Sequence, residues 1–76
     1  MARTADTLEP GQKALITQVD PDKIPLKLLE MGCLPGNQIE LLYRAPLGDP
    51  LFFDVNEGSH LAIRIETAQM IAVQLV

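Results

Sequence analysis

Hydrophobic and polar residues alternate along five short runs of the chain, and this pattern predicts five β-strands. The runs comprise residues 12–19, 38–44, 51–55, 60–65 and 71–76, and clusters of Gly, Pro, Asn and Asp separate them. Apolar side chains at every second position place one face of each strand in a core and the other in water. The expected inward set is Ala14, Ile16, Ile39, Leu41, Tyr43, Leu51, Phe53, Val55, Leu61, Ile63, Ile65, Ile71, Val73 and Leu75. We therefore expect a mainly β domain with an antiparallel sheet.

The loop between the third and fourth runs is short. It reads Asn56-Glu57-Gly58, and Asn and Gly both tolerate the positive φ angles of a tight turn, so these two strands should form a hairpin. Five short strands are few for two stacked sheets. Closing them into one barrel removes most exposed edges and hides a continuous face. We therefore predict a small β-barrel of about five antiparallel strands.

The segment 21–31 breaks the twofold alternation and predicts a short α-helix between the first and second strands. Its apolar residues recur at helical spacing: Ile24, Leu28 and Met31. Asp20 or Asp22 can cap the start of this helix, and Gly32 can adopt the left-handed conformation that ends it. About two helical turns are too few to be stable alone in water, so the helix should lie on the barrel as a lid. A shorter helical turn is expected at residues 66–70.

The length of 76 residues predicts one domain spanning residues 1–76, with residues 1–7 as a flexible N-terminus. A domain of this size has a barely adequate core and often needs a disulfide, a metal or a partner. Cys33 is the only cysteine and His60 the only histidine. The chain by itself therefore forms neither an internal disulfide nor a four-ligand zinc site of Cys and His. A lone cysteine favours a reducing cytoplasm.

The charge pattern argues against two classes of partner. Six Lys and Arg residues are scattered among ten Asp and Glu residues, and the net charge is −4. Binding to nucleic acid and adsorption to an anionic membrane both rely on clustered basic side chains. No run approaches the roughly 18 apolar residues of a membrane-spanning helix. We expect no nucleic-acid partner and no direct insertion into a membrane.

Residues with catalytic potential are sparse. Nucleophilic catalysis would need Cys33, Ser59 or a threonine, with His60 as its base. We interpret Cys33 as a small buried hydrophobic residue, and His60 falls on the outward phase of its strand. No glycine-rich phosphate loop is present, and a chain this short has little room for a substrate cleft. The sequence thus predicts a protein that is not an enzyme and has no catalytic residue, cofactor or metal ion.

Residues 45–50 form an unusually rigid connection, because two prolines fix their φ angles and a glycine allows a sharp turn. Leu47 lies in this turn, and Phe52 lies on the outward phase of the next strand. Both side chains either pack beneath the helix or form a small hydrophobic contact patch. We predict binding to a partner through the helix, this turn and their surroundings, and the candidate partner-binding residues are Leu26, Lys27, Pro46, Leu47, Gly48, Asp49 and Phe52.

Three segments resemble the ferrous iron transport protein A family, the FeoA-like domains. Residues 28–36, Leu-Leu-Glu-Met-Gly-Cys-Leu-Pro-Gly, are similar to the end of the family's helix. Residues 45–50 are similar to its proline turn, and residues 61–64 to one of its strands. The resemblance covers nearly the whole chain. It implies an SH3-like barrel and a cytosolic accessory that docks on the FeoB-type membrane transporter of ferrous iron, a GTPase, and modulates it.

The chain departs from the common pattern of that family at two places. Lys27 and Leu28 stand where members commonly carry arginine in the helix. Met31 and Cys33 replace commoner leucines. These differences should alter the packing of the helix more than the role of the domain.

Two other functions remain open at the level of sequence. FeoA-like domains resemble the C-terminal SH3-like part of metal-dependent transcriptional repressors, which gives a regulatory domain as one alternative. This chain shows no helix-turn-helix segment or basic face of its own. Acidic residues with His60 and Cys33 could instead form a metal-binding or metal-chaperone site across a dimer. A weak homo-oligomer is compatible with either interpretation.

Overall fold

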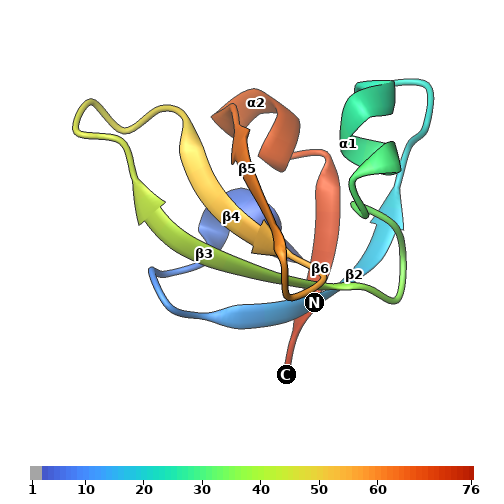
Figure 1. Ribbon diagram of the computed structural model, residues 1–76, viewed down its shortest axis with the longest axis horizontal. Coiled ribbons are helices and arrows are strands. Elements are labelled where there is room, and N and C mark those ends of the chain that lie inside the picture. Colours follow the sequence, from blue (N-terminus) through green and yellow to red (C-terminus); the bar gives the residue numbers. More distant parts are fainter. Residues whose placement is uncertain (1–2) are drawn as a thin grey trace.

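The computed structural model describes residues 3–76, which form one six-stranded antiparallel sheet with short helical segments (Figure 1). The strands are β1 (Arg3–Thr4), β2 (Lys13–Val19), β3 (Gln38–Arg44), β4 (Leu51–Val55), β5 (Ser59–Ile63) and β6 (Ile71–Leu75). The helical segments are the 3-10 helix η1 (Ala5–Thr7) and the α-helices α1 (Leu26–Glu30) and α2 (Ile65–Ala68). The strand order is β1-β6-β2-β3-β4-β5. Among the described residues, no helix is long and apolar enough to cross a membrane.

The five predicted strands correspond to β2 through β6, and α1 lies between the first two of them, as predicted. Their inward faces form one hydrophobic core. Most of the residues expected to point inward are buried: Ala14, Ile16, Ile39, Leu41, Leu51, Phe53, Val55, Leu61, Ile63, Ile71 and Val73. The twofold alternation therefore identified both the strands and the face that each of them buries.

The prediction of an inward side chain is wrong at two residues, Tyr43 and Leu75. Tyr43 is 54% exposed because the register between β3 and β4 shifts after Leu41, and such a bulge turns the following side chains to the other face. Ile65 begins α2 instead of ending a strand, but its half-buried side chain still packs against the core, as predicted. Leu75, at the end of β6, is 37% exposed. A local irregularity or the end of a strand explains each difference.

Residues 3–7, expected to be flexible, form β1 and η1 beside β6, whereas residues 1 and 2 lie outside the described residues. The side chain of Ala5 is fully buried. The Arg44 guanidinium, from β3, donates hydrogen bonds to the carbonyl oxygens of Asp6 at 3.1 Å and Leu8 at 3.0 Å. A sixth strand is thus added to the five expected. Periodicity does not predict it, because two residues are too few to show a period.

The C-terminal end of α1 is formed at Gly32, as predicted. Gly32 has a φ angle of 107°, and its N–H donates to the carbonyl of Leu29 at 3.1 Å. The N–H of Cys33 donates to the carbonyl of Leu28 at 3.0 Å. These two bonds form a Schellman motif, which requires a left-handed residue just after the helix. Cys33 is fully buried behind this motif, which confirms its interpretation as a small buried hydrophobic residue.

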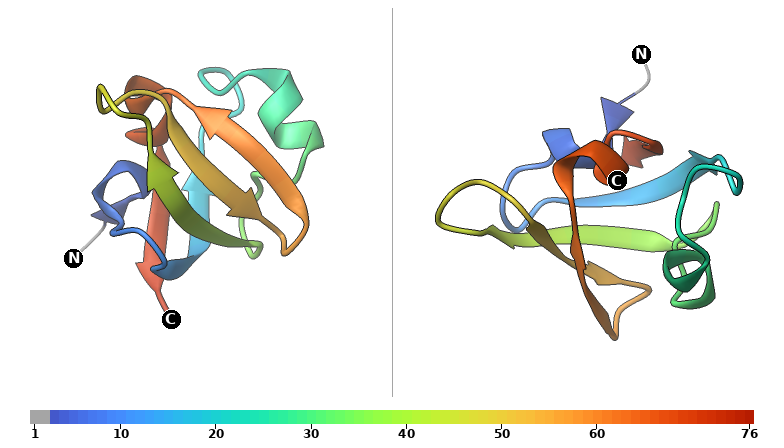
Figure 2. Two further views of the ribbon diagram at one scale, coloured as in Figure 1. Left: turned by 60° about the vertical axis from the view of Figure 1, so that its left-hand side comes forward. Right: turned by 90° about the horizontal axis from the view of Figure 1, so that it is seen from above.

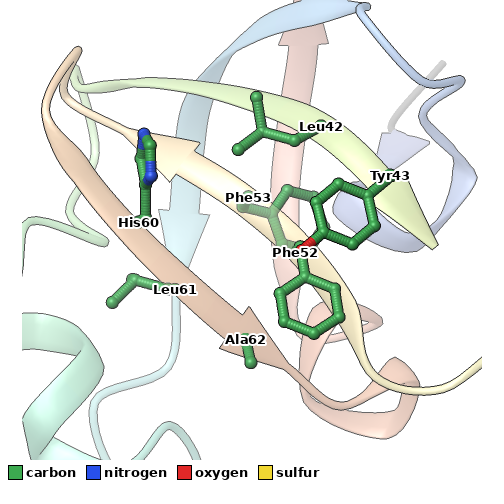
Figure 3. Close-up of a pocket in the computed structure, with 7 residues that line it drawn as sticks. All are labelled: Leu42, Tyr43, Phe52, Phe53, His60, Leu61 and Ala62. Carbon is green, nitrogen blue, oxygen red and sulfur yellow. The ribbon is translucent and has the colours of Figure 1, made fainter. Parts of the chain in front are cut away.

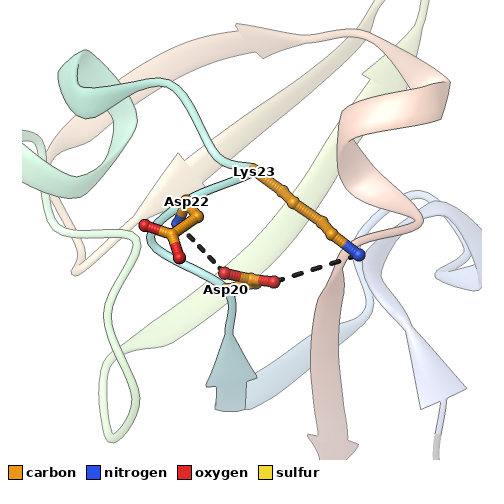
Figure 4. Close-up of polar contacts among 3 residues, drawn as sticks. All are labelled: Asp20, Asp22 and Lys23. Atoms are coloured by element: carbon orange, nitrogen blue, oxygen red, sulfur yellow. Dashed lines mark hydrogen bonds and ion pairs between the residues drawn. The ribbon is translucent and has the colours of Figure 1, made fainter.

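The N-terminal end of α1 lies later than predicted, because Pro25 disfavours the helical conformation for the residue before it. The prediction that Asp20 or Asp22 caps this helix is wrong, since the N-cap is Pro25 and no side chain caps it. The Asp20 carboxylate instead accepts a hydrogen bond from the backbone N–H of Asp22 at 3.0 Å (Figure 4). The Asp20 carboxylate also lies 4.0 Å from Nζ of Lys23. The contacts of Asp20 and Asp22 therefore stabilise the turn of residues 20–23, which is separate from the helix.

β4 and β5 form the predicted hairpin. The positive φ angles of its loop fall on Asn56 (56°) and Glu57 (54°) and not on Gly58, because the backbone reverses at the first two loop positions. Among residues 3–76, no strand pairing joins β5 to β1, so the ladder does not show the closed barrel expected from the sequence. Two edges remain, the two-residue β1 and the five-residue β5.

Candidate docking surface

Two aromatic rings stack on the outer face of the β3–β4 hairpin. Tyr43 and Phe52 are direct cross-strand partners, with ring centroids 4.6 Å apart and an interplanar angle of 16°. The bulge after Leu41 brings them together, because without the register shift Tyr43 would face the core. Tyr43 is exposed and Phe52 half-buried, so the stacked pair presents an apolar, rigid platform.

A half-open pocket of about 370 Å³ lies beside this platform (Figure 3). Its lining comes from three neighbouring strands and comprises Leu42, Tyr43, Phe52, Phe53, His60, Leu61 and Ala62. The volume is at the lower end of the range for small-molecule pockets. The lining is mainly apolar, and His60 at its margin is the only titratable group besides the Tyr43 hydroxyl. The pocket therefore suits an apolar side chain better than a substrate that must be ionised or cleaved.

The turn of residues 45–50 joins β3 to β4 next to the stacked rings. The Ala45 N–H donates to the carbonyl of Pro50 at 3.1 Å, and the Gly48 N–H donates to the carbonyl of Ala45 at 2.8 Å. Gly48 has a φ angle of 92°, which favours glycine at this position. Leu47 is 97% exposed at the tip. The alternative that Leu47 packs beneath the helix is therefore wrong, because the internal hydrogen bonds hold the turn away from the core.

Asp49 has a structural contact that the sequence did not indicate. Its Oδ1 atom accepts a hydrogen bond from the backbone N–H of Ile65 at 3.0 Å. This bond joins the turn to the first residue of α2. The Asp49 carboxylate is thus committed to positioning the turn, and Pro46 and Leu47 remain as its outward side chains.

The structure separates the predicted contact residues into two groups. Pro46, Leu47 and Phe52 lie on the β3–β4 hairpin, and together with Tyr43 we call them the hairpin surface. Leu26 and Lys27 lie on α1, which every view places at the opposite end of the molecule from the turn (Figures 1 and 2). Leu26 is 68% exposed. The helix and the turn therefore do not form one continuous patch.

The sequence did not indicate Tyr43, a member of the hairpin surface, or Ala62, which lies next to Phe52 on β5. Tyr43 was assigned to the core because the twofold alternation was extended through the bulge. Ala62 lies on the outward phase of β5 and pairs directly with Phe52, so the platform continues onto a third strand. The available signal was the presence of apolar residues, Phe52 and Ala62, at outward positions of two neighbouring strands, where polar residues are expected.

The potential metal ligands do not converge. Cys33 is fully buried, and burial raises the pKa of its thiol to about 11. His60 is exposed on the outer face, as predicted, with Nε2 3.8 Å from Oδ1 of Asp54. Within residues 3–76, no cluster of three or more Cys, His, Asp or Glu side chains has the geometry to hold a metal ion.

Comparison of the sequence with models of protein families assigns this chain to one family. The sequence profile of the FeoA domain matches residues 3–75. This chain belongs to the FeoA domain family. Members of the family are non-enzymatic accessory proteins related to ferrous iron transport. A comparison with curated proteins found no match.

Solved structures of FeoA proteins have the same fold. The chain is 29% identical to the FeoA protein of Chlorobium tepidum, with a TM-score of 0.86 over 97% of this chain and 70% of that one. It is 26% identical to Stenotrophomonas maltophilia FeoA, with a TM-score of 0.79 over 95% of this chain and 89% of that one. The latter is described as an SH3 domain protein complexed with zinc. The chain thus has the SH3-like fold of the FeoA family.

A metal-dependent repressor also shares this fold. A manganese-dependent transcriptional repressor in complex with manganese is 18% identical to the chain, with a TM-score of 0.79 over 99% of this chain and 37% of that one. At this identity the similarity shows the fold alone. It gives no support to a role in transcription for this chain.

Proposed function

We propose that this FeoA-family chain is a cytoplasmic accessory protein that docks on the cytosolic portion of the FeoB-type ferrous iron transporter and modulates it. The observation that carries this proposal is Leu47, which is 97% exposed at the tip of a hydrogen-bonded turn. A large aliphatic side chain held in water has no stabilising role in the isolated domain. It gains free energy only when another surface covers it.

The rigidity of the turn favours binding. Burying a leucine side chain contributes about 1.5–3 kcal/mol. A flexible loop would lose part of this gain through the entropy of ordering, whereas the turn of residues 45–50 is already ordered by its internal hydrogen bonds and by Asp49. The stacked rings of Tyr43 and Phe52 extend the apolar area beside it. Exposed aromatic side chains are enriched in protein interfaces.

The net charge supports a protein partner over nucleic acid or an anionic membrane. The net charge of −4 opposes binding to nucleic acid and to an anionic membrane surface. We therefore assign the hairpin surface as the main contact with the transporter. Leu26 and Lys27 on α1 form a second and separate contact region, which a large cytosolic partner can reach on another side of the domain.

The experiment is a calorimetric titration of the chain with the purified cytosolic portion of the FeoB-type transporter from the same organism. We expect a dissociation constant in the micromolar range, and a loss of at least about tenfold for Leu47→Asp, equivalent to about 1.4 kcal/mol. Leu26→Asp places the same charge on an exposed leucine of α1 and tests the second contact region. Phe52→Asp tests the platform, with a circular dichroism spectrum to show that it folds.

The titration distinguishes the two contact regions. A loss confined to Leu47→Asp assigns the contact to the hairpin surface, and a loss in both variants assigns it to both regions. Unchanged binding by Leu47→Asp and Phe52→Asp would overturn the hairpin surface as the contact. Absence of binding by the unmodified chain would overturn the proposed function itself.

A further inference from the structure

We propose that β5 accepts an added β-strand from a partner protein, and that a bulky apolar side chain of that strand packs over Ala62 against the ring of Phe52. The inference rests on the proposed function, since it describes how a docking partner is held. The partner segment is extended, pairs through its backbone, and carries an apolar side chain at the position opposite Ala62.

β5 is an edge strand with free backbone groups. It pairs only with β4, and β4 lies on one side of it. Within residues 3–76, no backbone hydrogen bond other than the β4 ladder involves residues 60–63. The N–H and C=O groups on the outer side of an edge strand need water or another strand as partners. The backbone of β5 is therefore available for pairing.

This edge also lacks the sequence features that normally prevent pairing with other chains. Natural edge strands are protected by charged residues, proline, bulges or short length. β5 reads Ser-His-Leu-Ala-Ile, with no Lys, Arg, Asp, Glu or Pro, and its register with β4 has no shift. The opposite edge, β1, has only two residues. β5 is thus the longer of the two edges and carries none of these protecting sequence features.

A cross-strand row of side chains leads to this edge. Tyr43 pairs with Phe52, and Phe52 pairs with Ala62, so the three side chains share the outer face in that order. Ala62 is exposed, and its methyl group is too small to cover the Phe52 ring (Figure 3). A side chain of a strand added beside β5 would lie next to Ala62 and continue this row. A bulky side chain there extends over Ala62 into the apolar pocket of about 370 Å³.

A second copy of the chain fits this place less well. The outward side chains of β5 are His60 and Ala62, and neither is both bulky and apolar. Pairing of two β5 strands that keeps the two outer faces on the same side would place only His60 or Ala62 in this row and leave the pocket unfilled. Each copy also carries a net charge of −4, which opposes self-association. The geometry favours a different protein as the source of the added strand.

The test uses the full ¹⁵N-labelled chain with two probes. The first is the cytosolic portion of the transporter, and the second is an acetylated hexapeptide of alternating threonine and leucine. A control hexapeptide carries proline at the threonine positions, which removes the backbone donors needed for pairing. We expect slower amide exchange in β5 with the transporter, and shifts at β5 and Phe52 with the threonine–leucine peptide only. Ala62→Phe should lower the affinity for the transporter at least about tenfold, whereas Ala62→Ser should keep it.

The outcomes separate this inference from the proposed function. If the transporter binds while β5 stays unprotected and Ala62→Phe binds normally, the strand addition is wrong and the proposed function stands. If the transporter does not bind, the proposed function fails, and the peptide decides the inference: shifts at β5 support it and their absence overturns it. Protection of β5 that rises with the concentration of the chain alone would also overturn it, because a second copy would then occupy the edge.

Discussion

The Asp49 carboxylate caps α2 from a turn that lies 16 residues away in the sequence, through a 3.0 Å hydrogen bond from the backbone N–H of Ile65. α2 has Arg64 as its N-cap, and no side chain at that position satisfies the first N–H groups of the helix. Asp49 supplies one of the missing acceptors. The turn that exposes Leu47 is therefore joined to the segment between β5 and β6.

Removing this cap should destabilise the domain. Asp49→Ala should lower the free energy of unfolding by about 1 kcal/mol, because an orphan N–H at the start of α2 loses its acceptor. Asp49→Asn keeps an acceptor oxygen and should lose less. Urea denaturation followed by circular dichroism measures both values. Equal losses in the two variants would show that the carboxylate charge, and not the hydrogen bond, is what stabilises the turn.

The exposed leucine should contribute almost nothing to stability. Leu47 is 97% exposed, so Leu47→Asp should change the free energy of unfolding by less than about 0.5 kcal/mol. Leu51→Ala, only four positions later but fully buried, should cost about 2–5 kcal/mol. Thermal and urea melts of the two variants provide the comparison. A large loss for Leu47→Asp would mean that the tip packs against the domain in solution.

The stacked rings should be energetically coupled. In a double-mutant cycle, Tyr43→Ala and Phe52→Ala should show an interaction energy of about 0.5–1.5 kcal/mol, the typical value for aromatic pairs. Tyr43→Ala combined with Leu26→Ala is the control pair, because α1 lies at the other end of the molecule and distant changes add. Additive effects in the first cycle would argue against stacking.

Two glycines allow a test of backbone strain without steric clashes. Gly32→Ala should cost about 1–2 kcal/mol, because its φ angle of 107° is unfavourable for an L-residue. The nearest atoms to an added Cβ there are at 3.6 Å, so the cost is conformational. Gly58→Ala meets no atom within 4 Å and has no positive φ angle, so its effect should be small. Urea denaturation compares the two, and similar losses would contradict this explanation.

The buried thiol should give a distinct dependence on pH. Burial raises the pKa of Cys33 from 9.0 to about 11, so the folded chain binds this proton more tightly than the unfolded chain. The resulting stability is complete below pH 9 and is lost as the pH rises toward 11. Unfolding free energies of the unmodified chain and Cys33→Ala, measured from pH 8 upward, isolate this contribution. The thiol should also react with a disulfide reagent only after unfolding, and rapid labelling of the folded chain would contradict its burial.

Local chemistry explains which features were predictable from the sequence. Leu51, Phe53 and Val55 alternate with more polar positions, and an extended chain has only two faces, so their burial follows from the pattern. Gly32 ends α1 because few residues other than glycine adopt a left-handed conformation at low cost. These preferences act over a few residues. They are therefore readable in a single sequence, and the family resemblance in the glycine and proline spacing has the same origin.

Contacts between distant segments decided the remainder. Tyr43 faces outward because of a register shift against β4, β1 exists because β6 offers a free edge, and Asp49 caps a helix that begins at residue 65. Leu26 and Leu47 are both predicted contact residues, but they lie on α1 and on the 45–50 turn, which the fold places far apart. The sequence by itself determined five of the six strands, the buried face of each and the family. Only the tertiary structure decided which outward side chains share a surface, because that depends on pairings between segments that no local preference encodes.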